Sequence, residues 1–214
     1  MSCRYLFREE RGSVENSILE IKTGYEEYPI YFNFKNFLSS AETVSSFVYT
    51  CIKADTGVDS SSSIIEGTPS LSTPRVTVGI KGGTDGEIHK ITITATTSLG
   101  QVFELEKFVE IDNSSIDGNF TIQPREDIII ACDFVNNPDM GSDSISTQSV
   151  TAIRTSDGTS ATSAVVLASN IDGKKVLVKV GDCAINEIYR VESTITTASG
   201  NKHQMNILAS CKEL

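Results

Sequence analysis

The sequence predicts an all-β protein made of two tandem β-sandwich domains that arose by internal duplication. Residues 75–100 align without a gap with residues 175–200, and the similarity extends upstream to Phe34 and Phe134 with one slipped residue. A repeated unit of roughly 85–90 residues is too long for a solenoid repeat and suits a small sandwich. Within each unit, short segments of alternating polarity are separated by glycine-containing turns, as in antiparallel strands.

The chain can be divided into four parts. Residues 1–28 have no counterpart in the second unit, and we expect them to form an N-terminal arm or to lie against the first unit as an additional strand. Within this segment, residues 17–22 fit a strand or a short helix. The first sandwich is predicted at 29–111 and the second at 127–214. Residues 112–126 are polar, which is typical of a short linker rather than a long flexible tether.

The predicted strands are clearest where the two units align. In residues 75–81 and 175–180 every second side chain is valine or isoleucine, which predicts strands with one buried face. In residues 89–97 the alternate positions are threonines, whose branched side chains suit a pleated surface. Gly100 and Gly200 follow as hairpin turns, where glycine adopts a positive φ at no steric cost. The chain has no tryptophan, so the antibody framework is excluded, but a broader immunoglobulin-like architecture is not.

Charge and hydropathy exclude two classes of partner. The chain has 214 residues and a formal net charge of −10. Binding to nucleic acid relies on clustered lysine and arginine, so we expect no nucleic-acid partner. No apolar run approaches the roughly 18 residues of a membrane span, and the charged N-terminus does not resemble an export signal. We therefore expect no membrane partner either.

The cysteines do not occupy matching positions in the two units. A disulfide shared by both domains would need matching pairs, so the sequence predicts free thiols in a reducing compartment. There is no CxxC motif, and the two histidines lie in different units, so neither a metal site nor a cofactor is predicted. The five cysteines are Cys3, Cys51, Cys132, Cys183 and Cys211.

No catalytic residue is predicted. The GxSxG elbow of serine hydrolases and the glycine-rich phosphate loops are absent. Glu87 and Glu187 recur in the two units, but each stands directly before a strand, which indicates a solvated charge with a structural role. The acidic turns lack the spacing of a calcium loop.

Aromatic residues are concentrated near the N-terminus, with eight of the fifteen in residues 1–37. Some belong to the core, because Phe34 recurs as Phe134. The others either pack the arm onto the first unit or form a protein interface, where tyrosine combines apolar area with a polar tip. A sugar-binding platform is a third interpretation. The candidate interface residues are Tyr5, Phe7, Tyr25, Tyr28 and Tyr31.

The repeated motifs resemble a known group of proteins. Each unit begins with Asn33-Phe34 or Asp133-Phe134. An acidic residue, a hydroxyl residue, a hydrophobic residue and two further hydroxyl residues follow, and Thr-Thr-x-x-Gly precedes the last strand. This pattern resembles the immunoglobulin-like units of structural proteins from tailed bacteriophages, in particular small neck or tail proteins that attach fibres.

The resemblance implies a function for the chain. It implies a non-enzymatic virion protein, assembled in the cytoplasm of the host bacterium, that acts as a connector or adaptor linking fibres to the particle. Such a protein would bind other neck, tail or fibre subunits as a symmetric homo-oligomer, with sheet edges, loops and the N-terminal arm making the contacts. The alternative is a receptor- or glycan-binding tip or capsid decoration protein. A hydrolase that uses acidic loops is the third hypothesis.

Overall fold

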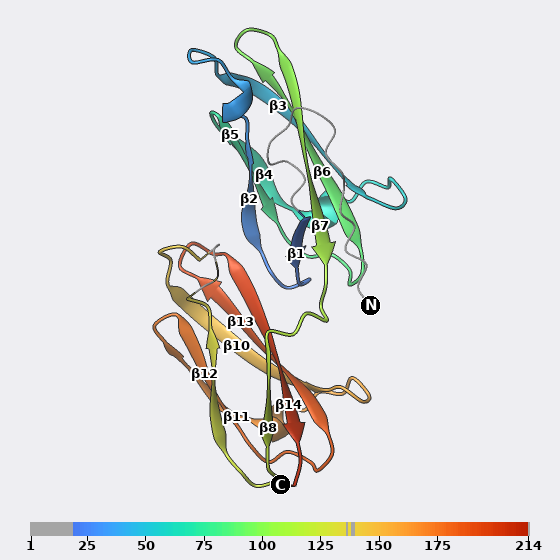
Figure 1. Ribbon diagram of the computed structural model, residues 1–214, viewed down its shortest axis with the longest axis vertical. Coiled ribbons are helices and arrows are strands. Elements are labelled where there is room, and N and C mark those ends of the chain that lie inside the picture. Colours follow the sequence, from blue (N-terminus) through green and yellow to red (C-terminus); the bar gives the residue numbers. More distant parts are fainter. Residues whose placement is uncertain (1–18, 136, 138–139, 214) are drawn as a thin grey trace. The chain divides into compact units, whose positions relative to one another are not determined.

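The computed structural model describes residues 19–135, 137 and 140–213, and the chain forms two compact units (Figure 1). The first unit comprises the residues up to Gly24 together with Pro29–Asn113. The second comprises Tyr25–Tyr28 and Ser114–Leu214.

The first unit is a sandwich of two sheets. One sheet has the strand order β1-β7-β6-β3 and the other has the order β2-β5-β4. β1 runs parallel to β7, whereas β3, β6 and β7 pair antiparallel. The elements are β1 (Leu19–Lys22), β2 (Tyr28–Asn33), η1 (Lys35–Phe37), β3 (Val44–Lys53), α1 (Ser61–Ile64), β4 (Ile65–Ser72), β5 (Arg75–Ile80), β6 (Ile88–Thr97) and β7 (Val102–Ile111).

The second unit repeats this arrangement strand for strand. Its sheets have the orders β10-β13-β14-β8 and β11-β12-β9, and β8 runs parallel to β14. In both units the second, fourth and fifth strands form one sheet, and the third, sixth and seventh strands form the other, as in immunoglobulin domains. The first strand joins the second of these sheets at its edge. The predicted tandem of immunoglobulin-like sandwiches is therefore confirmed. The elements are β8 (Gly118–Ile122), β9 (Ile128–Asp133), β10 (Ile145–Arg154), α2 (Thr162–Val165), β11 (Val166–Asp172), β12 (Lys175–Val180), β13 (Ile188–Thr197) and β14 (Lys202–Cys211).

The core lies between the sheets and follows the alternation expected from the sequence. Every second residue of β5 and of β12 is completely buried, and the intervening residues are at least partly exposed. The residues that share this pattern are Val76, Val78, Ile80, Val176, Val178 and Val180. Gly100 and Gly200 have φ angles of 79° and 93° in the hairpins, a conformation that only glycine adopts without strain.

Two segments that the sequence set apart from the sandwiches hold strands. Residues 19–22 form β1 on β7, so this part of the N-terminal segment is a strand and not a helix. Within residues 112–126, β8 pairs along the end of β14. Ile122 is buried and Phe120 packs against the core, whereas the intervening polar side chains face outward. The polar composition of the segment concealed this short alternation.

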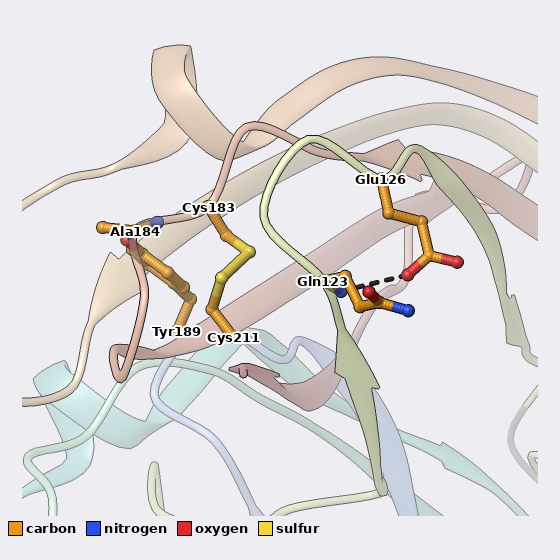
Figure 2. Close-up of a disulfide and its surroundings, with 6 residues drawn as sticks. All are labelled: Gln123, Glu126, Cys183, Ala184, Tyr189 and Cys211. Atoms are coloured by element: carbon orange, nitrogen blue, oxygen red, sulfur yellow. Dashed lines mark hydrogen bonds between the residues drawn. A yellow bond between two sulfur atoms is a disulfide. The ribbon is translucent and has the colours of Figure 1, made fainter. Parts of the chain in front are cut away.

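The second unit contains a disulfide between Cys183 and Cys211 (Figure 2). The prediction of free thiols is therefore wrong for this pair, while Cys51 and Cys132 are free and buried and Cys3 lies outside the described residues.

A comparison with the first unit explains why the repeat did not predict this disulfide. Its counterparts of Cys183 and Cys211 are Gly83 and Ile111. A Cβ atom added to Gly83 would lie 2.5 Å from Cγ1 of Ile111, so the isoleucine side chain occupies the space above the glycine. One unit fills the site by packing and the other by a covalent bond. Equivalent sites in a duplicated fold need not use the same chemistry.

Candidate interaction surface

The structure describes three of the five predicted interface aromatics. Tyr25 is 61% exposed in the loop between β1 and β2, and Tyr31 is 46% exposed on β2, whereas Tyr28 is only 7% exposed. Tyr5 and Phe7 lie outside the described residues. An interface role for Tyr25 and Tyr31 stays a prediction, and the burial of Tyr28 argues for a packing role there.

Tyr31 lies on an outer strand of its sheet, beside a cation. β2 is at the end of the order β2-β5-β4, and Cζ of Arg75 lies 4.9 Å from the centre of the Tyr31 ring. This is a cation–π contact, and it holds a guanidinium group against an exposed aromatic face. Tyrosine and arginine are the residue types enriched at the energetic centres of protein interfaces. The counterpart of Tyr31 in the second unit is Ala131, so the pair belongs to the first unit alone.

A second exposed apolar set lies where β6 turns into β7. Leu99 is 70% exposed and Val102 is 62% exposed. Phe37 in η1 contacts Phe103, with ring centres 5.4 Å apart. In Figure 1 the β6–β7 hairpin and η1 lie at the same end of the first unit, opposite the end of β7. We call Leu99, Val102, Phe37 and Phe103 the apolar end.

The aligned positions in the second unit carry polar side chains. Since both units share one strand order, the fold does not require apolar side chains there. Scattered exposed apolar residues are normal, whereas a group of them at one end of a domain is a candidate for a binding surface. The sequence analysis considered aromatic residues and therefore missed this set. The alignment of the two units nevertheless contains the contrast between apolar and polar residues at these positions. The counterparts of the apolar end are Asn137, Ser199, Lys202 and His203.

A buried polar network lies at the other end of the first unit. Nδ1 of His89 is 3.0 Å from Oγ of Ser60, and Nε2 of His89 is 3.3 Å from Oε2 of Glu87. Glu87 also accepts a hydrogen bond from Lys53, which lowers the pKa of its carboxyl group. Burial of the His89 ring lowers its pKa despite the neighbouring carboxylate.

This network contains the residue types of a catalytic triad, but a substrate has no access to them. Ser60 is 3% exposed and His89 is completely buried, so no substrate can reach the hydroxyl group. The second unit retains Glu187 but has Ala161 and Tyr189 in place of the serine and the histidine. We therefore interpret the network as part of the packing of the first unit. The carboxylate is not simply a solvated charge, because it reaches inward to the histidine.

Metal and membrane sites are not found in the described part of the chain. Among residues 19–135, 137 and 140–213, no group of three or more histidine, cysteine or acidic side chains is placed to hold a metal ion. No helix within these residues is long and apolar enough to cross a membrane. The exposed apolar and aromatic side chains of the first unit are therefore the features on which a functional hypothesis can be based.

Two immunoglobulin-like sandwiches in tandem define the class of modular all-β proteins. Within this class, residues 22–110 match the family described as podophage GP4 fiber-tail adaptor protein gp77. The match covers most of the first unit and less than half of the chain. It confirms the resemblance to fibre-attaching structural proteins of tailed phages. No curated protein gives a significant match to the chain.

Solved structures with two consecutive immunoglobulin domains are also similar to this chain. A chimeric titin Z1Z2 fragment is 11% identical, with 92% of this chain and 93% of the fragment covered and a TM-score of 0.34. The N-terminal Ig1-2 module of the Drosophila receptor protein tyrosine phosphatase DLAR is 10% identical, with 94% and 97% covered and a TM-score of 0.30. The strand order of the two units defines the immunoglobulin-like fold.

Proposed function

We propose that this protein is a non-enzymatic connector in the virion of a tailed phage, where it links fibres to the neck or tail. The observation that carries the proposal is the match of residues 22–110 to a fibre–tail adaptor family. The match supports a structural adaptor role and a place among the virion components. Fibre attachment through a symmetric set of copies, after assembly in the host cytoplasm, is the finer part of the proposal.

The first unit would anchor the protein through its apolar end. Complete burial of a leucine or valine side chain contributes about 1.5–3 kcal/mol, so Leu99 and Val102, which are already partly covered, would together contribute about 3 kcal/mol. The loss of rotational and translational freedom on binding offsets a contribution of this size. A single copy would therefore bind weakly. Several copies in a ring would bind together far more tightly, which supports the proposal of a symmetric oligomer.

The second unit would face the fibre. The family match ends at residue 110, before the strands of this unit, and the counterparts of Leu99 and Val102 are Ser199 and Lys202. Residues 112–214 contain 8 basic and 13 acidic side chains, a net charge of −5. Different surfaces on two copies of one fold suit a protein that must hold two different partners.

The experiment is a binding assay with the purified chain and purified neck, tail and fibre proteins of the same phage. The key variant carries Leu99→Ser and Val102→Lys, the residues that the second unit has at these positions. Because these sites are exposed, we expect the unfolding free energy to change by less than about 0.5 kcal/mol. Affinity for the neck or tail protein should fall at least tenfold.

Val58→Ser provides the matched control for this variant. Val58 is 57% exposed, close to the 62% of Val102, but it lies in the turn after β3 and not at the apolar end. Its substitution should leave the affinity unchanged. A wild-type chain that stays monomeric and binds no virion protein would contradict the proposal.

A glycan- or receptor-binding role is the second candidate, favoured by the exposed rings of Tyr25 and Tyr31. Aromatic faces of this kind can stack on sugars. A glycan array with the wild-type chain and with the Tyr25→Ala/Tyr31→Ala variant separates the two functions. A connector gives no sugar signal with either chain, whereas a glycan-binding protein gives a signal that the variant loses.

A further inference from the structure

The two units fasten one equivalent loop in different ways. In each unit this loop crosses from one sheet to the other, between β5 and β6 or between β12 and β13. In the first unit, Nζ of Lys22 donates a hydrogen bond of 2.7 Å to the carbonyl oxygen of Gly82 in the loop. In the second unit the counterpart of Lys22 is Ile122, which cannot donate, and Cys183 in the loop is bonded to Cys211 at the end of β14 (Figure 2).

The loop of the second unit also has a less favourable backbone. Gly82 and Gly86 have positive φ angles in the first unit, and their counterparts Asp182 and Asn186 have φ angles of 46° and 64°. Aspartate and asparagine tolerate this region better than other side chains do, but only glycine adopts it without a steric penalty. Without the disulfide, this loop would have neither the lysine fastening nor the glycines of its counterpart.

We propose that Cys183 and Cys211 form a redox latch that is open while the chain is in a reducing cytosol and closes after release from the cell. The timing rests on the proposed function, because a virion protein is made in the cytosol, where thiols are kept reduced. The closed latch holds residues 181–187 against the last strand. The open latch leaves them attached only by hydrogen bonds such as that from Asn186 N to Cys211 O.

The closing reaction is thiol–disulfide exchange with a low-molecular-weight disulfide such as oxidised glutathione. When the unlatched loop opens and exposes Cys183, the less buried of the two residues, its thiolate attacks the small disulfide, forms a mixed disulfide and releases one small thiolate. The thiolate of Cys211 then attacks the Cys183 sulfur and releases the second small thiolate. Two electrons pass from the protein to the small disulfide, and the two protons lost by the cysteines are taken up by the released thiols.

Hydrogen exchange on the purified full chain tests the latch itself. After reduction with dithiothreitol, amides in residues 181–187 and at the end of β14 should exchange at least tenfold faster than in the oxidised chain. The equivalent residues 81–87 of the first unit should not change. Equal exchange in the two redox states would overturn the proposal.

Two variants sharpen this measurement. Cys183→Ala/Cys211→Ala should exchange rapidly in both redox states. Cys132→Ala removes a buried free thiol from the same unit and should retain the redox difference. If the double variant does not fold, the comparison of reduced and oxidised wild-type chain still decides the question, since it needs no substitution.

The timing is tested by trapping thiols in the cell. Cells that produce the chain are quenched in acid, denatured and alkylated, and released particles are treated in the same way. Cys183 and Cys211 should be alkylated in the sample from cells and protected in the particles. A bond already closed in intact cells would overturn the timing. Because neither measurement involves a fibre or tail protein, the latch and the connector role can fail independently of each other.

Discussion

The two units share a strand order but differ in how they close the same end of the sandwich. The first unit buries Lys22, Ser60 and His89 there and joins them to neighbours through polar contacts. The second buries Ile122, Ala161 and Tyr189 at the equivalent positions and adds a disulfide nearby. The strand order therefore depends on the alternation of buried and exposed residues, which the units share. The means of fastening the loops can change without changing the fold.

The outer surfaces differ in the same way. The apolar end of the first unit, defined by residues such as Leu99 and Val102, corresponds to serine and lysine in the second. Duplication supplies two copies of a stable scaffold, and each copy can then acquire its own surface. Function is expected where the copies differ, because what they share is explained by the fold.

The largest expected effect is the loss of the disulfide. Cross-linking two residues 28 positions apart stabilises a domain by about 3–4 kcal/mol through the entropy of the unfolded chain. The Cys183→Ala/Cys211→Ala variant should therefore lose about this much unfolding free energy in the second unit under oxidising conditions, as measured by denaturant unfolding. The transition of the first unit is the internal control. If both transitions shift equally, the units do not unfold independently and the comparison must be revised.

Gly83→Ala should destabilise the first unit by about 3 kcal/mol. The new methyl group would overlap Ile111, and the φ angle of 97° is unfavourable for alanine. Gly86→Ala is the matched control in the same loop, since φ is also positive but no atom lies within 4 Å of the added Cβ. It should show only the backbone effect, about 1 kcal/mol. Equal effects of the two substitutions would disprove the packing of Ile111 above Gly83.

Lys22→Met should destabilise the first unit by about 2 kcal/mol, because the carbonyl group of Gly82 loses a buried hydrogen-bond donor. The amides of residues 81–87 should then exchange faster with solvent. Ile122→Met, the equivalent substitution in the second unit, removes no donor and should have a smaller effect. A Lys22→Met chain with unchanged exchange in this loop would show that the lysine does not fasten it.

The effect of pH should be smaller and confined to mildly acidic conditions. Burial lowers the pKa of His89, so the folded first unit binds a proton less readily than the unfolded chain. The stability that depends on neutral His89 is fully present above about pH 6.5, the pKa of an unperturbed histidine. It is lost progressively as the pH falls below that value. His203 should have the same effect on the second unit, because burial lowers its pKa too.

Thermal unfolding between pH 7.5 and 5 measures this dependence. His89→Gln should abolish the dependence of the first unit and leave that of the second unchanged. A first unit of His89→Gln protein that is as acid-sensitive as the wild type would exclude His89 as the cause.

Much of the architecture could be predicted because its signals are local. The alternation in residues 75–80 and 175–180 and the turns at Gly100 and Gly200 depend on residues that are adjacent in the sequence. β8 was missed because its five residues lie within a polar segment, and only Phe120 and Ile122 alternate there. The average polarity of the whole segment therefore does not indicate so short a strand.

The candidate surface was predictable only in part. Tyrosine is amphipathic, so its type did not distinguish the exposed Tyr25 from the buried Tyr28, three positions further along. The apolar end forms only when the fold brings the β6–β7 hairpin and η1 together. The aligned pairs Leu99/Ser199 and Val102/Lys202 did record the contrast between the units.

The sequence by itself determined that there are two units, that both are built from β-strands and that they share one order of strands and turns. Periodicity of two and turn-forming residues are properties of neighbouring positions, and the duplication displays them twice. Only the tertiary structure decided that Cys183 meets Cys211, that Ile111 covers Gly83 and that Lys22 reaches Gly82. These contacts join residues far apart in the chain, and they form only because strand pairing brings those residues to the same end of a sandwich.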